Sequence, residues 1–92
     1  MPEPPFFSVI IPTCNRPQTL AQCLRKLETQ TSQAKFHFET LVGDDSPDTR
    51  TRDLLVQHHP RAIWVKGPRK GPAANRNQAA RKAKGTWLIF ID

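Results

Sequence analysis

Hydroxyl, thiol and carboxylate side chains directly follow two short apolar runs in this sequence. The first run ends in Pro12-Thr13-Cys14, and the second ends in Asp44-Asp45. Dense apolar runs are typical of the buried strands of a parallel sheet, and ligands bind such sheets where the strands end. A carboxylate at that edge can accept a hydrogen bond from a ligand N–H. Asp also favours turns and helix caps, so a purely structural role for either Asp is the alternative.

Positive charge gathers in the second half of the chain. The formal net charge is +6, and no Asp or Glu occurs between Leu54 and Ile91. The same span carries Arg61, Lys66, Arg69, Lys70, Arg76, Arg81, Lys82 and Lys84. This asymmetry predicts an anionic partner, such as phosphate groups, nucleic acid or an acidic membrane surface. The segment Lys70-Gly71 lacks the glycine spacing of a Walker loop, so we expect an ordinary loop there.

The remaining reactive residue types indicate little chemistry. Cys14 and Cys23 are too few for a disulfide framework, and we expect both thiols to be reduced. Adjacent His58 and His59 would point in different directions on a helix and make no metal pair by themselves. Neither a signal peptide nor a run of membrane-spanning length is evident. The sequence therefore predicts a cytoplasmic protein, with peripheral contact at the cytoplasmic membrane face left open.

Strands and helices are predicted to alternate along the chain. We expect a disordered lead-in over residues 1–5 and strands near 6–12, 37–43, 62–66 and 86–91. The helices are expected over about 17–30, 48–58 and 73–84, with Asp48 as the N-cap of the second. Short crossovers between strands predict an α/β fold: a Rossmann-like parallel sheet with helices on both faces and the first strand central.

The third helix and the last strand have particular features. One face of the helix carries Ala73, Asn77, Ala80 and Ala83 or Lys84, and its small residues predict close packing on the sheet. Gly85 would end the helix in a left-handed conformation. The run 87–91 is the most apolar in the chain, yet it would form a sheet edge, which proteins normally avoid. We therefore expect this chain to be the N-terminal piece of a longer protein.

Four segments resemble the family 2 glycosyltransferases, which have the GT-A fold. These segments occur in the family's order and spacing, and the resemblance covers about residues 6–92. They are Ser8–Arg16, Val42–Asp48, Lys70–Asn77 with Ala83-Lys84-Gly85, and Trp87–Asp92. The resemblance implies that residues 6–92 are a partial nucleotide-sugar-binding domain, the N-terminal half of a GT-A fold, which stops at the start of an Asp-x-Asp metal motif.

This resemblance also implies an activity and a set of site residues. The activity is inverting transfer of a sugar from a nucleotide-diphosphate sugar to a hydroxyl of a glycan, lipid or protein, with a divalent metal (Mg²⁺ or Mn²⁺). The general base is expected beyond Asp92, and no catalytic residue is expected within the chain. Asp45 resembles the carboxylate that recognises the base, whereas Asp44 is expected to be structural. The implied nucleotide-binding residues are Pro12, Thr13, Cys14, Asp45 and Arg76, and the implied metal ligand is Asp92.

One departure and one alternative bear on this interpretation. Cys14 stands where the family often has an aromatic residue, and a cysteine cannot stack on a nucleobase. The alternative is a non-enzymatic basic α/β module that binds nucleic acid or anionic lipid through residues 61–84. Against nucleic acid as a partner, residues 61–87 contain only Trp64 and Trp87 as aromatic residues, and both are expected in strands.

Overall fold

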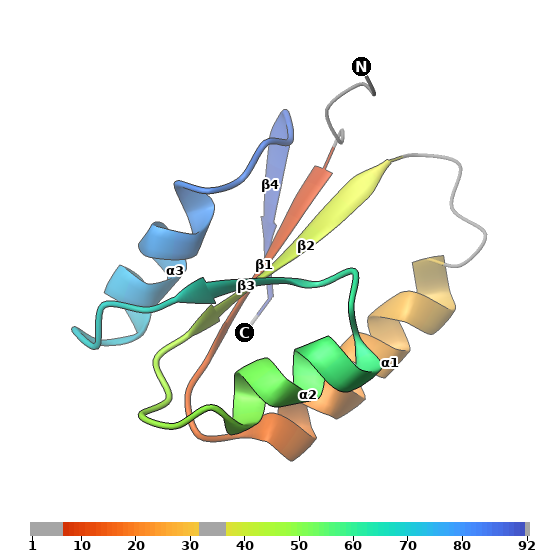
Figure 1. Ribbon diagram of the computed structural model, residues 1–92. Coiled ribbons are helices and arrows are strands. Elements are labelled where there is room, and N and C mark those ends of the chain that lie inside the picture. The colour runs from red at the N-terminus through yellow and green to blue at the C-terminus, as the bar shows by residue number, and fades with distance from the viewer. Residues whose placement is uncertain (1–6, 32–36, 92) are drawn as a thin grey trace.

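Seven elements alternate along the chain in the computed structural model, which describes residues 7–31 and 37–91 (Figure 1). The predicted lead-in over residues 1–5 lies outside the described residues. The elements are β1 (Phe7–Thr13), α1 (Pro17–Thr31), β2 (Phe38–Asp44), α2 (Arg50–His58), β3 (Ile63–Lys66), α3 (Pro72–Ala80) and β4 (Trp87–Phe90).

The four strands form one parallel sheet in the order β3-β2-β1-β4. In this register Ile10 of β1 lies opposite Leu41 of β2 on one side and Phe90 of β4 on the other. The prediction of a parallel α/β sheet with a central first strand is therefore confirmed. All four carboxyl ends lie at one edge of the sheet, where polar residues follow β1 and β2.

Helices cover both faces of the sheet, as predicted: α1 and α2 pack on one face and α3 on the other (Figure 1). Successive residues of a strand point to opposite faces, so neighbouring residues of β1 enter different layers of the core. Ile11 packs with Leu24 of α1 and Leu55 of α2, whereas Ile10 packs with Ala79 of α3. Burial on both faces explains why the apolar run in β1 is continuous rather than alternating.

Helix α3 differs from its prediction in both length and phase. It ends at Ala80 rather than near residue 84, because the chain turns there through Lys82 N–H to Ala79 O and Ala83 N–H to Ala80 O. The buried residues of the helix are Asn75 and Ala79, not Ala73, Asn77 and Ala80 of the predicted stripe; Ala83, its alternative last member, lies beyond the helix and is partly buried. Helix α2 begins after Thr49, one residue later than predicted, and Asp48 Oδ1 instead accepts from the backbone N–H of Arg50 over 3.2 Å.

Gly85 does not have the predicted left-handed conformation; Gly71, directly before α3, is the glycine with a positive φ (101°) among the described residues. Gly85 is required for a different reason. Its backbone N–H donates to Ser8 Oγ over 2.8 Å, and a Cβ there would lie 2.8 Å from the backbone carbon of Phe7. The connection from α3 to β4 therefore passes directly against β1.

Strand β4 forms an edge of the sheet and is poorly covered. Its residues Trp87, Leu88, Ile89 and Phe90 are exposed by 58%, 43%, 42% and 48%.

Within the part of the chain that the structure describes, no helix combines the length and apolar character needed to cross a membrane.

Candidate functional site

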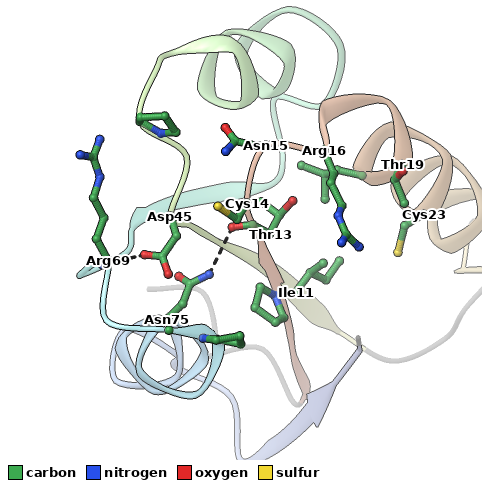
Figure 2. A pocket seen from close by; sticks show the side chains of 15 residues that line it. Ile11, Thr13, Cys14, Asn15, Arg16, Thr19, Cys23, Asp45, Arg69 and Asn75 are labelled. Atoms are coloured by element: carbon green, nitrogen blue, oxygen red, sulfur yellow. Dashed lines mark hydrogen bonds between the residues drawn. The ribbon is translucent and has the colours of Figure 1, made fainter.

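A cleft of about 700 Å³ opens at the carboxyl ends of β1 and β2, next to the start of α3 (Figure 2). This volume lies within the range of about 300–1,000 Å³ that small-molecule sites occupy. The residues that line it include Pro12, Thr13, Cys14, Arg16, Asp45, Arg69 and Asn75. Four of the five predicted nucleotide-binding residues therefore lie together in one cleft.

Asp45 is held in the wall of this cleft by contacts at both its backbone and its side chain. Its backbone N–H donates to Thr13 O over 3.0 Å, which joins the ends of β1 and β2. Its Oδ1 accepts a hydrogen bond of 2.9 Å from the backbone N–H of Arg69. The described residues offer no donor to Oδ2, so that oxygen is available to accept a hydrogen bond from a ligand.

Asp44, by contrast, is a structural residue, in line with its expected role. It is 3% exposed, and both carboxylate oxygens are engaged. Oδ1 accepts from the backbone N–H of Ser46, and Oδ2 accepts from the indole Nε1 of Trp64, each over 2.9 Å. The two adjacent carboxylates thus have separate tasks: Asp44 holds the turn after β2 and Asp45 faces the cleft.

Asn75 connects α3 to the base of the cleft and is not among the site residues predicted from the sequence. Its Nδ2 donates to Gly43 O over 2.9 Å and to Thr13 O over 3.3 Å, and the residue is 2% exposed. Its Oδ1 is buried without a hydrogen-bond partner among the described residues. The available signal was the four-residue spacing of Asn75 and Ala79, which puts both on one helix face.

The turn between β1 and α1 is shaped by Asn15, which has a positive φ of 56°. Asn tolerates this left-handed region better than most residues. The backbone N–H of Asn15 donates to Ser46 Oγ over 2.8 Å, so the turns after β1 and β2 are bound to each other. Cys14, one residue earlier, is exposed with a free thiol at the cleft, and Cys23 also lines the cleft with a free thiol.

Arg76, the fifth predicted nucleotide-binding residue, does not lie in the cleft with Asp45 and Thr13. Its guanidinium lies over the ring of Phe90 in β4, 5.4 Å from the ring centroid, and the residue does not line the cleft. Arg16 and Arg69 line the cleft instead (Figure 2). Positive charge is therefore present at the site, but it comes from two residues that the sequence analysis did not select.

The described residues do not make a metal site. Within residues 7–31 and 37–91, no group of three or more His, Cys, Asp or Glu side chains is arranged so that it could hold a metal ion. The predicted metal ligand, Asp92, lies outside the described residues.

Comparison with known proteins gives a family match for this chain. The family described as Glycosyl transferase family 2 matches residues 8–92, nearly the whole chain. The chain belongs to this family. The match includes every residue of β1 to β4 except Phe7, so the parallel sheet belongs to the N-terminal part of a family 2 glycosyltransferase.

Similar proteins named as glycosyltransferases come from several bacteria, and each is much longer than this chain. An uncharacterized glycosyltransferase of Haemophilus influenzae is 33% identical over 87 residues, covering 95% of this chain and 29% of that protein. A validoxylamine A glucosyltransferase of Streptomyces hygroscopicus subsp. limoneus is 35% identical, with coverages of 96% and 20%. A poly(ribitol-phosphate) beta-glucosyltransferase of Bacillus spizizenii is 31% identical, with coverages of 92% and 14%. The chain thus spans less than a third of these relatives.

Proposed function

We propose that this chain is the donor-nucleotide-binding part of a glycosyltransferase that transfers a sugar from a nucleotide-diphosphate sugar to an acceptor hydroxyl with inversion. The observation that carries the proposal is the cleft at the carboxyl ends of β1 and β2, with a half-buried Asp45 in its wall, in a family 2 chain. Residues 6–92 would form the first part of the nucleotide-sugar-binding domain, and the Asp-x-Asp motif would begin at Asp92.

Asp45 would recognise the base of the nucleotide. Because Arg69 N–H already occupies Oδ1, the other oxygen would accept a hydrogen bond from a ring N–H or an amino group of the base. Pro12, Thr13 and Cys14 line the same cleft and would contact the nucleoside. Cys14 would make this contact without aromatic stacking.

Positively charged residues would hold the diphosphate near the cleft. Arg16 and Arg69 line the cleft, and the donor geometry of a guanidinium matches phosphate oxygens. Arg76 remains a proposed nucleotide contact, although its guanidinium lies over Phe90 in this structure. Electrostatic attraction of this kind would favour binding and orientation of an anionic donor rather than supply a chemical step.

The remaining chemistry is proposed to depend on groups outside the described residues. A divalent metal such as Mg²⁺ or Mn²⁺ would neutralise charge on the leaving diphosphate when bound, with Asp92 as one ligand. A general base beyond Asp92 would take the proton of the acceptor hydroxyl, and such a base typically contributes about 100- to 10,000-fold in rate. We therefore expect the 92-residue chain alone to transfer no sugar.

The acceptor is proposed only as a hydroxyl of a glycan, lipid or protein. Two relatives, a poly(ribitol-phosphate) beta-glucosyltransferase and a validoxylamine A glucosyltransferase, are named for different acceptors although their chains are similar. A cytoplasmic location, with peripheral contact at an anionic membrane surface, is also proposed, because the net charge of +6 would favour such contact.

The alternative function, a basic module without activity, has no observation in its favour that equals the match of residues 8–92 to a transferase family.

The test is calorimetric titration of the full-length protein with UDP, GDP, CDP and ADP, followed by a diphosphate-release assay with the sugar derivatives of any that bind. We expect one nucleoside diphosphate to bind preferentially and its sugar derivative to be consumed in the presence of an acceptor. Absence of binding by all four would overturn the proposal. Binding that is unchanged by Arg16→Gln and by Asp45→Ala would place the nucleotide outside this cleft.

A further inference from the structure

A second, smaller pocket lies beside the cleft, between the turn that follows β2 and the end of β3. Its volume is about 380 Å³, and its lining includes Arg52 of α2, Lys66 at the end of β3, and Arg69. Pro47 and Arg69 line both this second pocket and the cleft, so the two hollows are neighbours along the carboxyl edge of the sheet.

Charge in the second pocket is unbalanced. Two carboxylates line it, and both are already engaged. Asp44 accepts from Ser46 N–H and Trp64 Nε1, and Asp48 Oδ2 forms a 3.0 Å ion pair with Arg50 Nε. The three basic residues named above have no carboxylate partner within 4.0 Å among the described residues. The lining therefore holds three basic side chains and two carboxylates, and one of these carboxylates, that of Asp48, is already paired with Arg50, so the hollow carries a net positive charge.

Trp64 provides a fixed platform for one of these charges. Its indole Nε1 is bound to the buried Asp44 carboxylate over 2.9 Å, which holds the ring in place. The guanidinium of Arg52 lies over that ring, 5.5 Å from the centroid. A cation stacked on an aromatic face keeps its N–H groups at the edge, where they can donate to an anion. Arg52 is thus positioned before any ligand arrives.

We propose that this second pocket binds a phosphate group through Arg52, Lys66 and Arg69. The chemistry is charge-assisted hydrogen bonding from two guanidinium groups and one ammonium group to phosphate oxygens. The phosphate has two possible sources: the diphosphate of a nucleotide in the neighbouring cleft, reached through the shared Arg69, or a separate phosphate-bearing molecule. Only the first source rests on the proposed nucleotide binding.

The experiment titrates the full-length protein with inorganic pyrophosphate and observes ³¹P NMR line broadening, at constant ionic strength. The test variant is Arg52→Gln with Lys66→Gln, which removes two charges while keeping polar side chains of similar length. The control is Arg81→Gln with Lys82→Gln, which removes the same charge from an exposed turn that lines neither pocket. We expect the test variant to bind pyrophosphate at least about tenfold more weakly and the control to change affinity less than about twofold.

Two further titrations distinguish the sources of the phosphate. If the nucleotide supplies it, the test variant weakens binding of a nucleoside diphosphate but not of its nucleoside, and pyrophosphate competes with the nucleotide. If the source is separate, pyrophosphate and nucleotide bind together, and the test variant leaves nucleotide affinity unchanged. Pyrophosphate binding without any nucleotide binding would keep this site but refute the proposed function. The inference is overturned if pyrophosphate does not saturate, or if test and control variants lose affinity equally.

Discussion

Asn75 and Gly43 are bound to each other in a way that permits no side chain on Gly43. The Nδ2 of Asn75 donates to Gly43 O over 2.9 Å, and a Cβ on Gly43 would lie 2.7 Å from Asn75 Oδ1 and 3.2 Å from the Cβ of Ala79. Helix α3 therefore approaches β2 at the very end that leads into Asp45. This contact determines the distance between the start of α3 and the turns that form the cleft.

Replacing Asn75 with Ala should destabilise the fold. The change removes the donor to the buried carbonyl group of Gly43, whereas Thr13 O keeps the N–H of Asp45, and an unsatisfied buried group costs about 1–3 kcal/mol. We expect the free energy of unfolding, measured by urea denaturation, to fall by that amount. Asn77→Ala, at an exposed position of the same helix, is the matched control and should stay within about 0.5 kcal/mol of the wild type. Equal effects of both changes would contradict a special role for Asn75.

Asp45→Ala should weaken nucleotide binding by about 1–3 kcal/mol, because a ligand donor buried in the cleft would lose its acceptor. Isothermal titration calorimetry on the full-length protein measures this directly. Asp53→Ala serves as the control, since it removes the same charge from an exposed position of α2 outside the cleft. Unchanged affinity for Asp45→Ala would remove this residue from the nucleotide site.

Two glycine substitutions should separate binding from stability. A Cβ on Gly67 would overlap Oδ1 of Asp45 and lie 2.6 Å from Oδ1 of Asn75, so Gly67→Ala should displace cleft residues. A Cβ on Gly85 would instead lie 2.8 Å from the backbone of Phe7 and of Ser8, at the opposite end of the sheet. We expect Gly67→Ala to lower nucleotide affinity at least about fivefold beyond any loss of folded protein.

Gly85→Ala is expected to lower the melting temperature without changing the affinity of the protein that remains folded. Thermal denaturation and calorimetry on both variants make the comparison. The opposite pattern, with Gly85→Ala weakening binding and Gly67→Ala leaving it intact, would show that the cleft is not shaped by Gly67.

The 92-residue chain expressed alone should self-associate. Strand β4 lies at the sheet edge and exposes four apolar residues, and such an edge is a template for pairing with another copy. We expect sedimentation velocity to show concentration-dependent species larger than a monomer. Ile89 is 42% exposed, and Ile89→Lys should reduce this association, because charge on an edge strand opposes pairing. A wild-type chain that stays monomeric at high concentration would disprove the prediction.

Local patterns in the sequence determined the fold class and the location of the cleft. Short dense apolar runs followed by polar turns indicate strands buried on both faces, and short crossovers restrict the sheet to a parallel arrangement. Since parallel strands end at one edge, the residues after β1 and β2 had to lie close together, and the structure places Thr13 and Asp45 there with a 3.0 Å hydrogen bond between their backbones. Family membership also follows from the sequence, because the family matches residues 8–92.

Only the tertiary structure decided which other groups face the cleft. Asn75 binds Thr13 across 62 positions of sequence, and the backbone N–H of Arg69 binds Asp45 across 24. Neither contact has a residue-type signature, because a backbone N–H is common to nearly all residues and the buried face of α3 depends on how the helix rotates against the sheet. Arg76 shows the reverse case: its residue type favoured the site, but the phase of α3 places its guanidinium over Phe90. Small side chains such as Ala79, which packs against both β1 and β2, set the rotation of the helix. The packing energy is distributed over the whole interface between helix and sheet, so it cannot be attributed to any single segment.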